Sequence, residues 1–126
     1  MVYVLLAIFV VHFLADFVFQ TSQMATGKSK SLKWLSIHVG VYALVSIISL
    51  LLISNSAHSY YLGFAWWLGN VALHFMTDFF TSKITSKFWE AKNYRFFFVM
   101  IGLDQLIHNL CLIGTYYAIL VYAHMI

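Results

Sequence analysis

The sequence predicts an all-α, polytopic membrane protein: a four-transmembrane-helix bundle made of two similar helical hairpins, with both termini outside the cell. Hydrophobic residues make up 63% of the 126-residue chain, charged residues make up 9%, and proline is absent. Soluble domains contain about 25% charged residues, so these few charges could not cover the apolar surface of a soluble fold. The length suits one domain, and we expect a single membrane domain over residues 1–126.

The apolar residues form four runs, and each is long enough for one bilayer crossing, which needs about 20 helical residues. The first run has no basic start and no small-residue cleavage site, so we do not interpret it as a signal peptide. The last run is long enough to tilt in the bilayer or to project beyond it. The expected spans are 1–19, 34–53, 60–80 and 96–123.

The polar connections predict the orientation of these spans. All seven Lys and Arg residues lie in two basic loops, 20–33 and 81–95, which follow the first and third spans. Basic loops are retained in the cytoplasm, so both loops are expected there. Both termini and the uncharged turn 54–59 would then lie outside. The sequence therefore predicts a multi-pass membrane protein whose basic loops lie in the cytoplasm.

A short polar motif occurs in both odd-numbered spans. Residues 12–17 read His-Phe-Leu-Ala-Asp-Phe, and residues 74–79 read His-Phe-Met-Thr-Asp-Phe. A spacing of four places the histidine and aspartate on one helix face, about 5–6 Å apart. The reverse pair, Asp104 and His108, lies in the last span, and a single His38 lies in the second. The matched motifs and topology predict an internal repeat of two parallel hairpins.

These polar side chains are expected to meet in the cytoplasmic half of the bundle. An aspartate within a membrane helix costs about 2.5–3.5 kcal/mol, and no expected span contains a Lys or Arg to compensate it. Imidazole and carboxylate together suit divalent transition metals, so we predict one or two Zn, Mn or Fe ions. Proton or ion handling without a fixed metal and a structural network between helices stay open. The expected metal ligands are His12, Asp16, His38, His74, Asp78, Asp104 and His108.

Other polar residues beside the expected ligands are candidates for orienting them or for binding a substrate. Gln20 continues the stripe of the first motif by one more helical turn, and Gln105 and Asn109 flank the ligands of the last span. Lys83 follows the second motif by little more than a turn. It is expected at the cytoplasmic mouth, where it would neutralise a phosphate.

The pattern of these residues resembles a family of small bacterial and phage membrane proteins of unknown function. The resemblance covers residues 12 to about 109 and rests on His12-x-x-x-Asp16-x-x-x-Gln20, His38, His74-x-x-x-Asp78 and Asp104-Gln105-x-x-His108. The sequence is also distantly similar to the inner-membrane metal-dependent hydrolases, which carry His-x-x-x-Asp motifs in membrane helices. The first resemblance supports the importance of the polar cluster, and the second implies a hydrolase. Together they imply a multi-pass protein of the bacterial inner membrane.

We therefore expect an intramembrane metal-dependent hydrolase whose site opens to the cytoplasm. A metal-activated water, with its pKa lowered to about 7, would be the nucleophile, and Asp16 or Asp78 would act as the general base. A phosphoester or lipid-linked substrate would suit a membrane site with a basic mouth. The lipid bilayer is the expected partner; nucleic acid is not expected, and a homo-oligomer stays open.

Two other functions are compatible with the same residues. A divalent-cation or proton transporter or channel would use the His and Asp cluster as a transit site, although the outer half of the spans carries few polar groups. A small interaction protein would use the cluster to hold its helices together.

Overall fold

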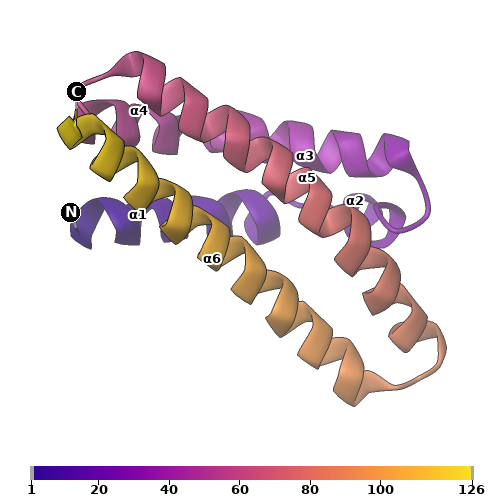
Figure 1. The fold of residues 1–126 in the computed structure, drawn as a ribbon. Helices are drawn as coiled ribbons and strands as arrows, with labels where there is room; N and C mark the ends of the chain where they lie inside the picture. The colour runs from indigo at the N-terminus through magenta and orange to yellow at the C-terminus, as the bar shows by residue number, and fades with distance from the viewer. Residues whose placement is uncertain (1, 126) are drawn as a thin grey trace.

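The computed structural model describes residues 2–125, and the secondary structure within this range is entirely helical (Figure 1). This confirms the all-α prediction. The helices are α1 (Val2–Phe13), the π-helical segment η1 (Leu14–Val18), α2 (Ser22–Gly27), α3 (Leu32–Val45), α4 (Ile47–Ser56), α5 (Tyr60–Glu90) and α6 (Tyr94–Met125).

The predicted bundle of four transmembrane helices is wrong. Among the described residues, α6 is the one unbroken helix that is both long and apolar enough to cross a membrane. The expected second span is divided into α3 and α4, which are bent by 42° and would count as one further span only if taken together. The first apolar run forms a shorter helical stretch, Val2–Val18. Helix α5 is long, but buried polar residues interrupt its apolar sequence.

The break between α3 and α4 has a local cause at Ser46. The hydroxyl of Ser46 donates to the backbone carbonyl of Ala43 at 3.1 Å, a back-bond that often bends helices. The indole Nε1 of Trp67 in α5 also donates to this carbonyl and to the Ser46 hydroxyl, at 3.1 Å in each case. A side chain from a neighbouring helix is therefore inserted where the helix bends.

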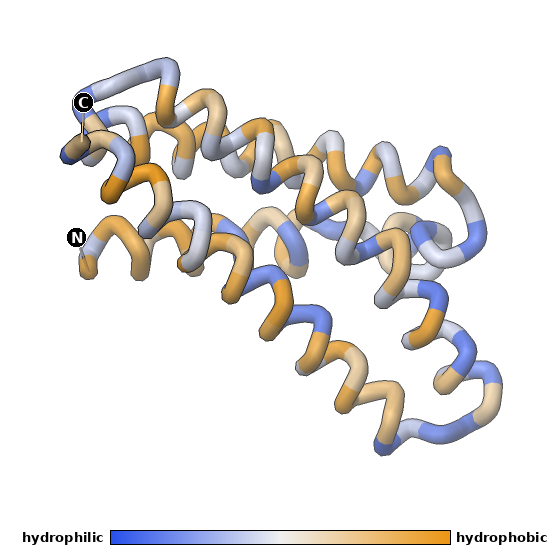
Figure 2. The backbone as a smooth tube through the Cα atoms, viewed as in Figure 1, coloured by the Kyte–Doolittle hydropathy of each residue, from blue (hydrophilic) through white to orange (hydrophobic). Residues whose placement is uncertain are grey.

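The helices are arranged so that the polar connections lie at one end of the molecule. Helices α5 and α6 form a long antiparallel hairpin, and α3 and α4 pack along α5 (Figure 1). Both described chain ends lie at one end of the molecule, and the α2–α3 and α5–α6 connections lie at the other. Hydrophilic residues are concentrated at this second end (Figure 2). We call it the basic end, because residues 28–33 and 87–95 carry lysines there.

A hydrophobic core lies between the helices toward the opposite end. Its buried members come from four helices: Ile8, Ile53, Trp66, Leu112 and Tyr116. Along α1, α5 and α6, the core residues lie at least one helical turn from the predicted metal ligands. They lie toward the end of the molecule that carries both chain ends. The core therefore lies next to the polar cluster, on the side away from the basic end.

The two expected basic loops are largely helical. The segment 20–33 includes α2, which begins after Thr21, whose hydroxyl accepts from Met24 N at 3.3 Å. The segment 81–95 is helical as far as Glu90, and only a short turn separates α5 from α6. This extension of α5 carries a row of hydroxyl side chains toward the basic end.

The outer face of α6 is apolar and is not covered by the other described helices. Only 11% of its most apolar 18-residue window is buried, whereas a core helix of a soluble protein would be mostly buried. Exposed side chains along this face are Phe98, Leu106, Leu110, Tyr117 and Val121. Apolar surfaces this extensive usually contact lipid or another protein.

Close packing of α4 against α5 gives a stability prediction at Gly63. A Cβ atom there would overlap the Ser54 hydroxyl and lie 2.9 Å from the Leu50 carbonyl oxygen. We expect Gly63→Ala to lower the free energy of unfolding by about 1–3 kcal/mol, as overpacking does. The matched control is Gly69→Ala, which meets nothing within 4 Å and should raise it by about 0.5–1 kcal/mol. Unfolding in detergent followed by circular dichroism measures both, and equal effects would contradict this packing.

Candidate metal centre

The seven predicted ligands come together in one buried cluster between the helices. Six of them are no more than 4% exposed, and the side chain of Asp104 is 13% exposed. The cluster draws its residues from five segments, α1, η1, α3, α5 and α6. Asp16 lies within η1, and π-helical turns inside helices are frequent at functional sites.

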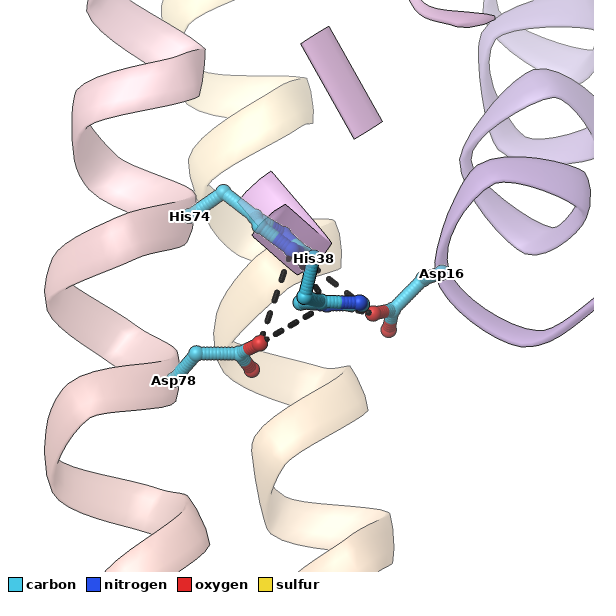
Figure 3. A group of neighbouring side chains, drawn as sticks. All are labelled: Asp16, His38, His74 and Asp78. Atoms are coloured by element: carbon cyan, nitrogen blue, oxygen red, sulfur yellow. Dashed lines mark hydrogen bonds and ion pairs between the residues drawn. The ribbon is translucent and has the colours of Figure 1, made fainter. Parts of the chain in front are cut away.

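Four side chains form the tightest part of the cluster, and we call them the central group: Asp16, His38, His74 and Asp78 (Figure 3). The Nε2 atom of His38 lies 3.1 Å from Asp16 Oδ1 and 2.9 Å from Asp78 Oδ2. It also lies 3.2 Å from His74 Nε2. The latter nitrogen is 3.6 Å from each of the same two oxygens. One ring nitrogen carries a single hydrogen at most, so hydrogen bonding cannot satisfy all these contacts.

The spacing of these four atoms suits a shared cation. Ligand atoms at the metal distances of a tetrahedral site, about 2.0–2.2 Å, lie about 3.3–3.6 Å from one another. The five measured separations in the central group run from 2.9 to 3.6 Å. All four ligand atoms lie within 4.8 Å of one another, so the central group could hold a metal ion.

In two further sets of side chains, the ligand atoms also lie within 4.8 Å of one another. One consists of His12, Asp16 and His108, and the other of Asp78, Asp104 and His108. Each shares an aspartate with the central group. All seven predicted ligands are therefore within reach of a metal position, although their roles as ligands stay a prediction.

Several polar atoms in this cluster are buried without a hydrogen-bond partner among residues 2–125. They are His12 Nδ1 and Nε2, His38 Nδ1, His74 Nδ1, Asp78 Oδ1 and His108 Nε2. A buried polar group without a partner costs about 1–3 kcal/mol, and more when it is charged. A bound cation would supply a partner for the carboxylate oxygens and for the free imidazole nitrogens that face it.

Side chains around the ligands hold them in place, as outer partners do in metal sites. The Gln105 amide donates to Asp16 Oδ2 at 2.7 Å and to Asp104 Oδ2 at 3.1 Å. Thr81 donates its hydroxyl to the other oxygen of Asp104. The Nδ1 atom of His108 lies 2.9 Å from the Asp104 carbonyl oxygen. When Nδ1 carries the ring proton and donates it to this carbonyl, Nε2 keeps a lone pair that faces the cluster.

The ring of Tyr42 also fixes the central group, and the sequence analysis did not identify it. Tyr42 is 3% exposed and stacks on His74, with ring centroids 3.8 Å apart and ring planes 2° from parallel. Tyr42 follows His38 by four residues, and this spacing places both side chains on one face of α3. The spacing could therefore have identified Tyr42 from the sequence.

A lysine from α2's C-terminal end reaches the central group. The Lys28 ammonium donates to Asp78 Oδ2 at 2.9 Å. Lys83, the lysine selected from the sequence, is exposed and lies over the Phe79 ring, 3.4 Å from its centroid. The structure thus places Lys28 at the site, while the catalytic roles predicted for Asp16, Asp78 and Lys83 stay predictions.

A cleft of about 650 Å³ leads from the basic end to the three aspartates. Gln20 and Gln105 border it, whereas Asn109 is half-buried and lies outside its lining. Aromatic side chains Phe17, Trp89 and Phe97 form part of its wall. The charged side chains of Lys28, Lys30 and Glu90 also line it. Six hydroxyl side chains belong to the lining as well: Thr26, Ser29, Thr81, Ser82, Thr85 and Ser86. The cleft can therefore admit a molecule with both a polar and an apolar part.

Burial and neighbouring charges shift the pKa values of the central group in opposite directions. Burial lowers the pKa of His38, but hydrogen bonds to Asp16 and Asp78 outweigh it, so that this pKa is raised. Burial raises the pKa of Asp16 and of Asp78, but the adjacent His38 ring, His74 and the Lys28 ammonium outweigh it, so that both pKa values lie below the ordinary range. Burial lowers the pKa of His74 well below its ordinary value, despite the two carboxylates beside it. Ionised carboxylates and neutral imidazole are the forms that bind metals.

Comparison with known proteins identifies a family but no activity. No curated protein and no solved structure matches the chain. Residues 4–126 match DUF3307, described as a protein of unknown function. The expected resemblance to a family of unknown function is confirmed, and the resemblance to membrane hydrolases stays a prediction. Because the match covers nearly the entire chain, the protein belongs to the DUF3307 family of proteins of unknown function.

Proposed function

We propose that this protein is a metal-dependent hydrolase that cleaves phosphoesters. One observation carries the proposal: four ligand atoms of the central group lie within 4.8 Å of one another, beside a cleft lined by hydroxyl groups and two lysines. Catalytic metal sites combine His and carboxylate ligands with an accessible position for water. Two imidazole nitrogens and two carboxylate oxygens favour Zn, Mn or Fe over Mg or Ca, which prefer oxygen ligands.

The residues along the cleft suit a phosphate group with an alcohol substituent. When bound, the metal lowers the pKa of water and polarises the phosphate oxygens. The water oxygen forms a bond to phosphorus while the bond from phosphorus to the alcohol oxygen breaks. The departing alcohol oxygen takes a proton from solvent, and the products are phosphate and the alcohol.

Asp104 is the carboxylate best placed to accept the proton from water. It borders the cleft, is the most exposed of the three aspartates and lies outside the central group. Hydrogen bonds from Thr81 and Gln105 hold its two oxygens. In this proposal Asp16 and Asp78 are metal ligands, and the Lys28 ammonium binds the phosphate group of the substrate.

We further propose that α6 crosses the bacterial inner membrane and that the cleft faces the cytoplasm. The apolar, uncovered outer face of α6 supports its insertion into lipid. The lysines at the basic end support a cytoplasmic orientation for that end. An amphiphilic, lipid-linked phosphoester could then enter the cleft from the membrane surface, with its apolar part against the aromatic wall.

A transport function has less support from the arrangement of the residues. The cleft reaches the cluster from the basic end, and the hydrophobic core of Ile8, Trp66 and Leu112 lies on the opposite side. A site that is entered from one side supports hydrolysis more than passage of a cation.

Hydrolysis by purified protein in detergent tests the proposed function. The metal-free protein is loaded with Zn, Mn or Fe(II) and given p-nitrophenyl phosphate or bis(p-nitrophenyl) phosphate. We expect metal-dependent release of p-nitrophenol that stops after chelation. Absence of stoichiometric metal, or hydrolysis that chelation leaves unchanged, would overturn the proposal. Metal flux into liposomes without hydrolysis would favour transport instead.

The two lysines give a matched test of the substrate position. Lys28→Ala is expected to raise KM for the phosphoester about 10- to 100-fold, because a hydrogen bond to a charged group contributes about 1.5–3 kcal/mol. Lys83→Ala removes the same charge from the exposed side of α5 and should change KM less than about twofold, the scale of a weak surface charge effect. Metal content is measured in both variants to separate substrate binding from metal loss. Equal effects of the two substitutions would contradict the assignment.

A further inference from the structure

We propose that the cluster holds a second metal ion, bound by His12, Asp16 and His108 and bridged to the first by the carboxylates of Asp16 and Asp78. The inference rests on the proposed function only in placing the first ion in the central group. It concerns metal content, which can be measured separately from hydrolysis.

Each shared aspartate presents its two oxygens to opposite sides of the cluster. Asp16 Oδ1 lies 3.1 Å from His38 Nε2, whereas Asp16 Oδ2 lies 3.9 Å from His12 Nε2. Asp78 Oδ2 lies 2.9 Å from His38 Nε2, whereas Asp78 Oδ1 lies 4.0 Å from His108 Nε2. A carboxylate that bridges two metals uses one oxygen for each metal. The ions of such two-metal sites are about 3.5–4 Å apart.

The histidines on the second side have free nitrogens. His12 is 4% exposed, and neither of its ring nitrogens has a hydrogen-bond partner among residues 2–125. His108 is 3% exposed, and its Nε2 is also without one, while its Nδ1 faces the Asp104 carbonyl oxygen. The two rings are adjacent, with centroids 5.2 Å apart. The central group does not use either histidine, so a second cation accounts for both.

The charges predict that the second ion binds more weakly than the first. One divalent ion and the Lys28 ammonium already balance the three carboxylates of the cluster. A second ion adds two positive charges, which an incoming phosphate dianion would neutralise. The contacts on this side, 3.9 and 4.0 Å, are also longer than those of the central group. Inorganic phosphate should therefore increase the affinity for the second ion.

Manganese binding to the purified protein tests this inference. Mn²⁺ is titrated into metal-free protein, with and without inorganic phosphate, and bound metal is measured by elemental analysis and electron paramagnetic resonance. We expect two ions per chain at saturation with phosphate present, and a spectrum that shows exchange coupling between them. His12→Ala should lower the stoichiometry from two to one and abolish the coupling. The remaining ion would show that the central group is still folded.

Control variants separate this inference from the proposed function. His124→Ala removes an exposed histidine outside the cluster and should leave two ions bound. His108→Ala should repeat the effect of His12→Ala. A single ion in the unmodified protein at saturation, or an uncoupled spectrum, would overturn the inference and leave the proposed function standing. Two coupled ions without phosphoester hydrolysis would support the inference and overturn the proposed function. No bound metal would overturn both.

Discussion

Asp78→Asn is expected to remove the metal and, with it, the proposed hydrolysis. Asp78 is 0% exposed, and its Oδ2 lies 2.9 Å from both His38 Nε2 and the Lys28 ammonium. Asparagine has nearly the same shape but lacks the charge, and its amide nitrogen cannot act as a metal ligand. Loss of an outer partner alone lowers metal affinity about 10- to 100-fold, so loss of this ligand should lower it by at least about 100-fold.

Equilibrium dialysis with Zn²⁺ or Mn²⁺, followed by elemental analysis, measures this effect. Glu90→Gln is the matched control, because Glu90 is exposed and is the one acidic residue of the chain outside the cluster. It removes the same charge and should leave the affinity within about twofold, as an exposed charge contributes little. Unchanged metal affinity in Asp78→Asn, with its helical content intact, would show that the central group does not hold the metal.

The cluster was predictable because its signals are local. A spacing of four places the histidine and aspartate of each motif on one helix face whatever the helix packs against. Carboxylates and imidazoles in apolar helices also need partners, so they are driven toward one another. These two arguments identified the seven side chains, from His12 to His108, that each belong to at least one group able to hold a metal ion.

The membrane topology was not predictable in the same way, because it depends on contacts between distant residues. Hydropathy treats every apolar run as a straight helix. It does not show that Trp67 inserts at Ser46 and bends the second run, or that a π-helical turn ends the first. Lys28 was missed as an Asp78 partner for the same reason, since the small helix α2 that carries it toward the site was expected to be a loop.

Removal of the metal is expected to destabilise the fold strongly. Without a cation, three carboxylates and four imidazoles lie in one cluster, with the Lys28 ammonium as the one lysine paired there among the described residues. A ligand present at 100 times its Kd stabilises the native state by about 2.7 kcal/mol. Each kcal/mol shifts the melting temperature by about 2–8 °C for chains of 60–250 residues, so chelation should lower it by at least about 5 °C.

Thermal unfolding in detergent, followed by circular dichroism with and without a chelator, measures this shift. Readdition of Zn²⁺ or Mn²⁺ should restore the melting temperature, because the ion binds the folded cluster and not the separated ligands of the unfolded chain. Asp78→Asn is the internal control: if it no longer binds metal, the chelator should not change its melting temperature. An unchanged melting temperature in the unmodified protein, despite confirmed metal loss, would mean that the buried side chains stabilise one another without an ion. The cluster would then be a structural network of polar side chains between the helices and not a metal centre.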